Sequence, residues 1–508
     1  MAAFSTDTVI GVIGAGAMGA GIAQVAAAAG HQVLLFDTAE TAIAAGIDRT
    51  AKGLDRQVTR NKMTLAARDA LLERLVPCTA IEDLAPAGLV IEAIVEDLKV
   101  KRQVFRQLES ICGPEVVFAS NTSSISITAI AAALQNPGRL LGMHFFNPAP
   151  VMKLVEVVSG IETEKAIDEQ VFDTARSWGK KVVHAVSTPG FIVNRVARPY
   201  YAEALRLLQE GATDEATIDA LMREAGGFRM GPFELMDLIG NDVNFAVTCS
   251  VYDAYFQDPR FRPSLIQQEL VNAGHLGRKT GRGYFRYGEG VQAPCPVTAS
   301  AEQAPERLVV HGQLGPAQQL VSLASAPGIQ VTEVDGDGVL EVDGVILALS
   351  DGRTATRRAA DTGHPNTVLF DLSIDYARCK RIAIAAADQA DHAALTRAAG
   401  LFQAIGFEVS VVEDVAGLVV MRSVCMLANE GADAVYNGVC DAAAVDHAML
   451  FGVNYPRGPL AWADAIGVSR VVAFLDHLAA HYGEERYRVS PFLRRKQLAG
   501  QPLLGEQQ

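Results

Sequence analysis

Residues 8–37, TVIGVIGAGAMGAGIAQVAAAAGHQVLLFD, decide the fold of this chain. The apolar run at 9–13 has the length and composition of a strand that is buried on both faces. The Ala-rich segment at 17–29 favours a helix, and the glycine that follows favours the end of that helix. A second apolar run at 33–36 leads directly to Asp37. This order predicts a strand, a helix and a strand that form one βαβ unit.

Three glycines between the first strand and the helix, Gly14, Gly16 and Gly19, have the G-x-G-x-x-G spacing. In a dinucleotide-binding loop the first permits a tight turn, the second lets a pyrophosphate approach, and the third allows close helix packing. The helix N-terminus adds positive potential for phosphate oxygens. Asp37 follows about 20 residues later, where a carboxylate accepts hydrogen bonds from ribose hydroxyls and repels a 2′-phosphate. The stretch predicts an NAD site, and a plain βαβ unit with a tight turn is the alternative.

The composition is that of a globular protein. With 508 residues, 49% of them hydrophobic and 20% charged, the chain is expected to form about two to four domains. The net charge of −14 argues against nucleic acid or an anionic membrane as the partner. Its 7 cysteines have neither C-x-x-C spacing nor histidine-rich surroundings, which favours reduced thiols over a metal site or disulfides. We see no signal peptide and no uncharged apolar run of membrane-spanning length, so we expect a cytoplasmic protein.

Four further apolar runs continue the predicted sheet, at 89–93, 116–120, 139–146 and 153–158. In an open α/β sheet, ligands bind beyond the carboxyl ends of the strands. Ser123 and His144 lie at or near such ends, whereas Glu156 lies inside the last run. The Pro148/Pro150 segment is expected to bring Glu156 back beside His144.

A predicted helix after Asp37 carries a stripe of basic residues at spacings of three and four, namely Arg49, Lys52, Arg56 and Arg60. The stripe is either a solvated helix face or a surface that receives the anionic part of a ligand. The sequence favours neither alternative.

The segment from Phe191 to about Gly281 is predicted to be helical, with a kink at Pro199 and a new helix at Gly231-Pro232. Arg198 lies one helical turn after Asn194, so both side chains are expected on one helix face. If Asn194 faces a substrate cleft, Arg198 could pair with a carboxylate at the far end of the ligand. Pairing with an acidic residue of the protein at a domain interface is the alternative.

The C-terminal half contains an internal repeat of this helical segment. The stretch PGFIVNR at 189–195 recurs as AGLVVMR at 416–422, and Gly231-Pro232 recurs as Gly458-Pro459 at the same distance. Without a gap, Arg195, Glu203, Gly211, Asp219, Met222, Asp237 and Gly240 align with Arg422, Glu430, Gly438, Asp446, Met449, Asp464 and Gly467. Such a register predicts a duplicated helical domain.

The second copy differs from the first at the positions of the candidate catalytic residues. The pairs are His144 with Asp371, Glu156 with Ala383, and Asn194 with Met421. No G-x-G-x-x-G precedes the second copy. Instead, residues 290–380 carry short apolar runs separated by three Asp-Gly pairs, which predicts a degenerate β-rich or α/β piece with Asp335-Gly336, Asp337-Gly338 and Asp343-Gly344 at turns.

These features together resemble the L-3-hydroxyacyl-CoA dehydrogenase family, in particular its longer bacterial members that act in aerobic phenylacetate degradation. The motifs that carry the resemblance are GAGAMG at 14–19, EAIVE at 92–96, SNTSS at 120–124, HFFNP at 144–148, KLVEVV at 153–158, TPGFIVNR at 188–195, MGPFEL at 230–235 and GRKTGRGYF at 277–285. The resemblance implies a Rossmann-type NAD-binding domain at 1–188, a helical domain at 189–287, a degenerate piece at 288–414 and a second helical domain at 415–508.

The resemblance also implies roles for individual residues. His144 would be the general base that accepts the hydroxyl proton, and Glu156 would orient its imidazole. Ser123 and Asn194 would contact the reacting oxygen or the thioester, although serine and asparagine also cap strand ends and helix starts. The contacts implied on the nicotinamide and ribose side are Glu96, Lys101, Ser123, Asn147 and Lys279.

The expected activity is therefore NAD-dependent oxidation of a 3-hydroxyacyl-CoA to a 3-oxoacyl-CoA, with an acyl-CoA as the partner. A general short- or medium-chain dehydrogenase is the nearest alternative, and a non-catalytic nucleotide-binding protein is a remote one. A fused hydratase is not expected, because the repeat accounts for the residues after 290. The two helical domains are expected to pair within the chain, as those of two subunits do in shorter members, and a homodimer is possible in addition.

Overall fold

The computed structural model describes residues 2–505, which form two compact units. The first unit contains the chain up to Arg195 together with Asn437–Val453. The second contains Val196–Tyr436 together with the chain from Asn454 onward. A short segment of the C-terminal half thus belongs to the same unit as the N-terminal domain.

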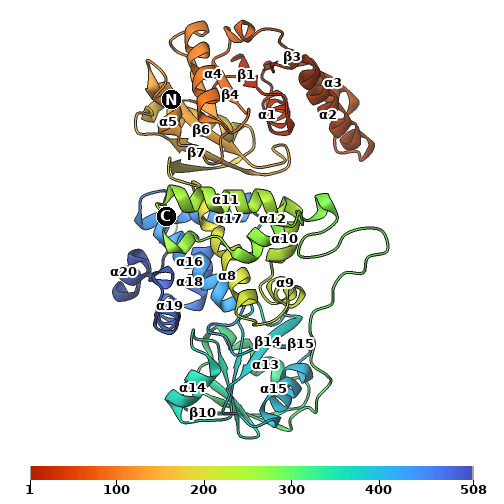
Figure 1. The fold of residues 1–508 in the computed structure, drawn as a ribbon, viewed down its shortest axis with the longest axis vertical. Coiled ribbons are helices and arrows are strands. Elements are labelled where there is room, and N and C mark those ends of the chain that lie inside the picture. Colours follow the sequence, from red (N-terminus) through yellow and green to blue (C-terminus); the bar gives the residue numbers. More distant parts are fainter. Residues whose placement is uncertain (1, 506–508) are drawn as a thin grey trace. The chain divides into compact units, whose positions relative to one another are not determined.

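The first unit is built on an eight-stranded sheet with the order β3-β2-β1-β4-β5-β6-β7-β8 (Figure 1). Its strands are β1 (Ile10–Ile13), β2 (Val33–Phe36), β3 (Leu75–Pro77), β4 (Leu89–Glu92), β5 (Val117–Ser120), β6 (Leu140–Phe145), β7 (Leu154–Ser159) and β8 (Lys181–Val186). All neighbours are parallel except β6 and β7. Its helices are α1 (Ala17–Ala28), α2 (Glu40–Thr59), α3 (Leu65–Glu73), α4 (Leu98–Ile111), α5 (Ile127–Ala131), α6 (Lys165–Ser177) and α17 (Ala442–Gly452).

The predicted βαβ unit is confirmed within one residue at each boundary. Strands β1 and β4 are fully buried, as expected of a parallel sheet that is covered on both faces. The order of the strands reverses at β1, which pairs with β2 on one side and β4 on the other. Such a reversal opens a crevice beyond the carboxyl ends of the two central strands, where ligands bind in this class of sheet.

The second unit contains most of both helical copies, whereas α17 of the second copy belongs to the first unit. The first copy has α8 (Arg198–Gln209), α9 (Glu215–Glu224), α10 (Pro232–Ile239), α11 (Asn241–Ala254) and α12 (Leu265–Asn272). The second has α16 (Val420–Tyr436), α18 (Pro459–Ile466), α19 (Val468–Tyr482) and α20 (Pro491–Ala499). The helical segment is interrupted at Ala197, two residues before Pro199, where a kink was predicted. The short helix α7 (Val193–Val196) ends first, and Pro199 then lies in the first turn of α8, where its missing N–H breaks no helical hydrogen bond.

A second sheet of seven strands has the order β10-β9-β11-β12-β13-β14-β15. The strands are β9 (Arg307–His311), β10 (Gln330–Val334), β11 (Val339–Val342), β12 (Val345–Leu349), β13 (Thr367–Phe370), β14 (Arg381–Ala386) and β15 (Glu408–Val411). Helices α13 (Gln319–Ser325), α14 (Ala355–Thr362) and α15 (Ala393–Ala404) accompany it. The last four strands pair parallel, antiparallel, parallel, in the same pattern as β5–β8. The second sheet therefore repeats the later half of the first and lacks a counterpart of the glycine loop.

The Asp-Gly pairs play two different roles in this sheet. Asp343 and Gly344 both have positive φ (48° and 80°) and join antiparallel β11 and β12 as the predicted tight hairpin. The other two pairs also lie between strands, as expected, but the strands they connect are not neighbours in the sheet. They lie in the connection from β10 to β11, two strands that are separated by β9.

The two copies exchange helices between the sheets. Helix α9 of the first copy packs on β14 of the second sheet, and Figure 1 shows the two side by side. Helix α17 of the second copy packs on β7 and β8 of the first sheet. In the second unit, α8 packs against α16, so the two copies pair within one chain as expected.

The α8–α16 interface contains buried charge. The Arg422 side chain is fully buried, and its Nε donates to Glu203 Oε2 at 2.8 Å. Its Nη1 and Nη2 donate to the two carboxylate oxygens of Glu210 at 2.8 and 2.9 Å. The hydroxyls of Tyr482 and Tyr487 complete the network. Removing one member would leave a buried charge without its partner, so the pairing of the copies depends on this network.

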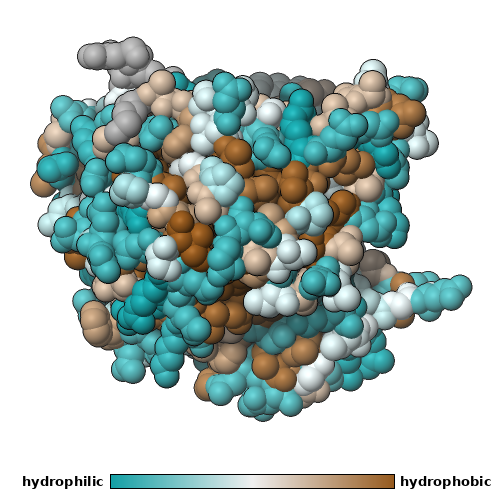
Figure 2. Space-filling model, turned by 90° about the horizontal axis from the view of Figure 1, so that it is seen from above, coloured by the Kyte–Doolittle hydropathy of each residue, from teal (hydrophilic) through white to brown (hydrophobic). Residues whose placement is uncertain are grey.

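The face of the molecule in Figure 2 is covered mainly by hydrophilic residues, with apolar residues in smaller groups between them. In the described part of the chain, no helix is both long and apolar enough to cross a membrane. The 7 cysteines are all free thiols.

Candidate active site

The glycine loop follows β1 at the reversal point of the first sheet. Gly14 has a φ of 98°, and a side chain there would meet the Ala93 carbonyl oxygen at 2.4 Å. A Cβ on Gly19 would lie 1.8 Å from the Gly14 carbonyl oxygen, so helix α1 can pack on the loop only with glycine at this position. A Cβ on Gly16 would meet no described atom within 4 Å. Two glycines are thus required for packing, and Gly16 faces open space at the N-terminus of α1, where a pyrophosphate fits.

Asp37 lies at the end of β2 and closes the other side of this loop. One carboxylate oxygen accepts a hydrogen bond from the Ala15 N–H at 2.8 Å, and the other accepts from the Ala39 N–H at 3.0 Å. The side chain is only partly buried, and its remaining lone pairs are free to accept from ribose hydroxyls. These residues fit a bound NAD.

A buried ion pair supports the next strand end. Glu92, which is 0% exposed at the end of β4, accepts from Lys101 Nζ and from the Ser120 hydroxyl, both at 2.7 Å. Lys101 is 1% exposed and also lies 3.3 Å from Glu96. The structure therefore places Lys101 against two carboxylates inside the domain. Glu92 begins the EAIVE motif, but its spacing in the sequence does not indicate this buried role.

Glu96 organises the loop that contains Ser123. Its Oε1 accepts hydrogen bonds from the Thr122 hydroxyl and from the backbone N–H groups of Ser123 and Ser124. These bonds, together with the charge of Lys101, outweigh burial and lower the pKa of Glu96 below its ordinary value. The carboxylate is therefore ionised at neutral pH and fixes the turn after β5. On the other face of this turn, Asn194 Nδ2 donates to the Ser123 carbonyl oxygen at 3.4 Å.

His144 and Glu156 are direct cross-strand partners on the antiparallel strands β6 and β7. The distance from His144 Nδ1 to Glu156 Oε2 is 2.6 Å. Because a carboxylate only accepts, Nδ1 carries the proton and Nε2 is left as the basic nitrogen. Glu156 Oε1 accepts hydrogen bonds from the backbone N–H groups of Ile192 and Val193, at 3.1 and 3.0 Å, at the start of α7. The carboxylate is fully buried and held from two sides, so the imidazole has a fixed orientation.

Aromatic rings surround the imidazole. Phe146 lies with its ring centroid 4.5 Å from that of His144, and Phe191 lies at 5.8 Å. Phe191 has a positive φ of 47°, an uncommon conformation for a bulky residue, directly before the amides that bind Glu156. The adjacent loop is tied to β6 because the Asn121 side-chain oxygen accepts from the Phe145 N–H at 2.8 Å.

The second copy has replaced this pair by one carboxylate. Asp371, at the position of His144, is fully buried and accepts the backbone N–H groups of Val419, Val420 and Met421 at 2.7 to 3.0 Å. Burial raises its pKa to about 6, although these hydrogen bonds oppose the rise. Asp371 thus anchors the start of α16 as Glu156 anchors the start of α7, with no imidazole beside it.

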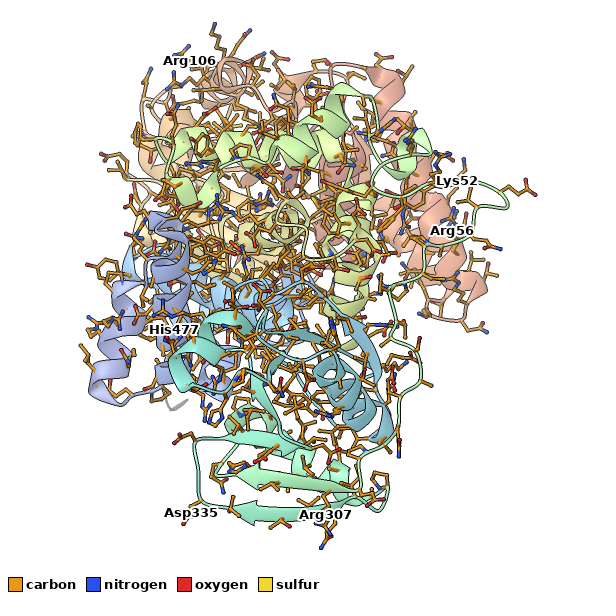
Figure 3. The ribbon with its side chains drawn as sticks, turned by 60° about the horizontal axis from the view of Figure 1, so that its bottom comes forward. Lys52, Arg56, Arg106, Arg307, Asp335 and His477 are labelled. Carbon is orange, nitrogen blue, oxygen red and sulfur yellow. The ribbon has the colours of Figure 1, made fainter. Side chains whose placement is uncertain are left out.

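The other predicted residues lie in different surroundings. The basic stripe is on the exposed side of α2, where Lys52 pairs with Asp48 at 2.6 Å, and Figure 3 shows Lys52 and Arg56 along its outer side. Asn147 is exposed after β6. Lys279 belongs to the second unit, where its Nζ contacts both oxygens of Asp242 at 2.5 and 2.7 Å.

Arg198 is buried in the second unit at the start of α8, with 6% of its surface exposed. Its Nη1 donates to the Thr248 hydroxyl at 3.1 Å, and its guanidinium lies 5.0 Å from the centroid of the Tyr201 ring. Within the second unit, the hydrogen-bond partner of Arg198 among the described residues is the Thr248 hydroxyl and not a carboxylate. Asn194 lies in the short helix α7 and Arg198 begins α8, and Ala197 between the two helices has a right-handed helical backbone conformation.

A glycine loop at the reversal point, an acidic residue after β2 and a fixed imidazole–carboxylate pair define an NAD-dependent dehydrogenase that acts on an alcohol. Three family descriptions match the chain: the NAD-binding domain of 3-hydroxyacyl-CoA dehydrogenase at 9–188, its C-terminal domain at both 190–287 and 417–506, and a reduced Rossmann-fold domain of 3-hydroxybutyryl-CoA dehydrogenase at 347–415. The chain belongs to the 3-hydroxyacyl-CoA dehydrogenase family.

Relatives of two lengths match. The 3-hydroxyadipyl-CoA dehydrogenase of Escherichia coli K12 is 47% identical over 489 residues, which cover 96% of this chain and 97% of the relative. Human mitochondrial hydroxyacyl-coenzyme A dehydrogenase is 41% identical over 286 residues, which cover 54% of this chain and 90% of the relative. A crystal structure described as 3-hydroxybutyryl-CoA dehydrogenase from E. coli K12 superposes with a TM-score of 0.89 at 45% identity, covering 98% and 99% of the two chains. The chain is an NAD-dependent 3-hydroxyacyl-CoA dehydrogenase of the longer type.

Proposed function

We propose that this enzyme oxidises (S)-3-hydroxyadipyl-CoA to 3-oxoadipyl-CoA in phenylacetate catabolism in the cytoplasm. The observation that carries the reaction is the 2.6 Å contact between His144 and a Glu156 carboxylate that is held by two backbone amides. The full-length similarity to a 3-hydroxyadipyl-CoA dehydrogenase supports the substrate. A 3-hydroxybutyryl-CoA substrate is the second candidate, because a structure of similar length carries that description.

His144 Nε2 accepts the proton of the substrate 3-hydroxyl as the C3 hydride leaves. When bound, NAD supplies the acceptor for that hydride. Glu156 accepts from Nδ1–H throughout and stabilises the imidazolium that forms, without accepting the proton itself. A positioned base of this kind contributes about 10²- to 10⁴-fold to the rate.

Ser123 and Asn194 are proposed to hold the reacting oxygen or the thioester carbonyl. Their proximity, with Asn194 Nδ2 3.4 Å from the Ser123 carbonyl oxygen, supports a joint role. Glu96 and Lys101 are positioning residues for this loop, and with Asn147 and Lys279 they are proposed on the nicotinamide and ribose side. The exposed stripe of Arg49, Lys52, Arg56 and Arg60 is proposed to receive the phosphates of coenzyme A.

Arg198 is proposed to bind the distal carboxylate of the adipyl chain. Its buried guanidinium has only one hydrogen bond to a described residue, to Thr248, and therefore retains free donors. A hydrogen bond to a charged group contributes about 1.5–3 kcal/mol, which corresponds to about 10- to 150-fold in affinity.

The test is a comparison of kcat/KM on 3-hydroxyadipyl-CoA, 3-hydroxyhexanoyl-CoA and 3-hydroxybutyryl-CoA, each with NAD and with NADP. We expect the highest value with 3-hydroxyadipyl-CoA and NAD. Arg198→Leu should lower kcat/KM on 3-hydroxyadipyl-CoA about 10- to 150-fold, and it should leave kcat/KM on the neutral hexanoyl thioester of the same chain length nearly unchanged. An equal loss on both esters would exclude the carboxylate contact, and a preference for the butyryl ester would exclude the proposed substrate.

The pairing of α8 with α16 supports a chain that supplies both halves of the helical interface itself. We therefore propose that any homodimer forms through a surface other than the α8–α16 interface. Light scattering of Arg422→Ala would test this, because loss of the α8–α16 network should destabilise the chain without changing the mass of a dimer.

A further inference from the structure

A cavity of about 380 Å³ lies in the second unit along one face of α8. Side chains from α8, α11, α12 and the segments around Arg260 and Arg486 form its walls. The volume is within the range of about 300–1,000 Å³ that is usual for small-molecule sites. Apart from Arg198, none of its residues has a role in the reaction proposed above.

The walls carry more positive than negative charge. Five arginines and two glutamates line the cavity, namely Arg198, Arg206, Arg260, Arg262 and Arg486 with Glu210 and Glu484. Both glutamates already have arginine partners: Glu210 binds Arg422, and Glu484 Oε2 accepts from Arg206 Nη2 at 2.8 Å. Arg260 is likewise paired, with Glu430 at 3.2 Å.

Arg486 is buried with 3% of its surface exposed, and its Nε has no hydrogen-bond partner among the described residues. The nearest carboxylate oxygen, from Glu484, is 3.7 Å away and already accepts from Arg206. Burial lowers the pKa of Arg486 to about 10, so the side chain remains a cation at neutral pH. The charges of Glu203 and Glu484 lie near Arg486, but neither carboxylate satisfies its Nε, and a buried polar donor without an acceptor is costly unless a ligand supplies one.

Arg198, in another wall of the same cavity, is also a buried arginine whose Nε has no hydrogen-bond partner among the described residues. It is 6% exposed, and its hydrogen bond among these residues is the one that Nη1 donates to the Thr248 hydroxyl. Arg262 lines the cavity as well, but it is exposed to solvent. The buried cations Arg198 and Arg486 and the exposed cation Arg262 thus line the same cavity.

We propose that this cavity is an oxyanion site, in which Arg486 and Arg198 bind a phosphate or carboxylate group of a small ligand and Arg262 attracts it at the solvent end. The planar guanidinium offers paired donors that match either group. The oxyanion could come from a free anion or from the acyl chain of a substrate. The inference stands whether or not the substrate proposed above is correct, because binding of a free anion requires no turnover.

The test is thermal unfolding and calorimetric titration of the full-length enzyme with inorganic phosphate and with adipate, against sodium chloride at equal ionic strength. We expect saturable binding and a rise in melting temperature with at least one of the two anions. Arg486→Gln and Arg262→Gln should weaken binding at least tenfold. Arg494→Gln is the matched control, because Arg494 pairs with Asp476 outside the cavity, and it should bind as the parent does.

Arg262 is exposed, so its variant keeps the test valid even if Arg486→Gln does not fold. The proposal is overturned if neither anion binds more tightly than chloride does, which is the result expected of a cavity that holds water only. It is also overturned if the Arg262→Gln variant binds the anion as tightly as the Arg494→Gln variant does. Competition kinetics then identify the source of the oxyanion. If the anion competes with 3-hydroxyadipyl-CoA but not with 3-hydroxybutyryl-CoA, the cavity binds the substrate carboxylate. If the anion binds without competing with either substrate, the cavity binds a free ligand.

Discussion

Replacing Glu156 by glutamine changes one atom in the proposed catalytic pair and keeps its shape. The carboxylate now accepts from two backbone N–H groups through one oxygen and from His144 Nδ1 through the other. A glutamine has one oxygen, and we expect that oxygen to stay on the two amides, because the alternative places two donors against its NH₂ group. The NH₂ group would then face His144 and donate to Nδ1, which moves the imidazole proton to Nε2 and leaves no basic nitrogen toward the substrate.

The Glu156→Gln variant is expected to lose the rate contribution of the general base, and with it the stabilisation of the imidazolium that forms. A base contributes about 10²- to 10⁴-fold, so kcat should fall by that factor, which is about 2.7–5.4 kcal/mol in the activation barrier. KM for NAD should change little, since Glu156 makes no contact with the glycine loop. NADH formation from NAD and 3-hydroxybutyryl-CoA in the forward direction, followed by absorbance, measures both quantities.

Asp371→Asn provides the matched control, because it changes a carboxylate that holds the start of a helix in the second copy. This variant should lose stability and keep its kcat per folded molecule. If Glu156→Gln lowered kcat by less than tenfold, or if Asp371→Asn lowered it as much, the assignment of the base would be refuted.

Three further predictions concern the frame around this site. Gly16→Ala should fold with unchanged stability and raise KM for NAD, whereas Gly19→Ala should also lower the melting temperature, since its Cβ would lie 1.8 Å from a carbonyl oxygen. Arg422→Ala should lower the free energy of unfolding by about 3–5 kcal/mol in urea titrations, because it leaves the buried Glu203 carboxylate without its ion-pair partner and with the Tyr487 hydroxyl as its remaining donor among the described residues. Burial raises the pKa of Asp219 to about 7 from 3.8. The folded state then retains a proton that the unfolded state loses, so stability should fall as the pH rises from about 4 to about 7, and Asp219→Asn should reduce that slope.

The parts of the fold that local chemistry specifies could be predicted from the sequence. The boundaries of β1, α1 and β2 were correct because glycine spacing and apolar run lengths are local signals. The approach of Glu156 to His144 could also be predicted, since a proline-containing bend returns one strand beside the other. The repeat register predicted both helical copies and the loss of the second pair.

The contacts that the sequence did not predict are mostly between distant segments. Nothing local indicates that α17 packs on β7 and β8, or that the connection from β10 to β11 passes β9. The burial of Lys101 against Glu92 was missed because its spacing of nine residues crosses a strand end and a helix start. The arginine cavity was missed for the same reason, as its walls come from residues about 290 positions apart.

The exchange of α9 and α17 makes the packing of each half of the chain depend on the other half. Each helix covers a sheet of the other half, so deleting the second copy would uncover β7, the strand that carries Glu156. Asp371 takes the position of the imidazole in the second copy, and it still accepts hydrogen bonds from the start of α16, the helix that pairs with α8. The second copy is therefore a scaffold for β7, and a chain truncated after residue 287 should expose that strand unless a second molecule covers it.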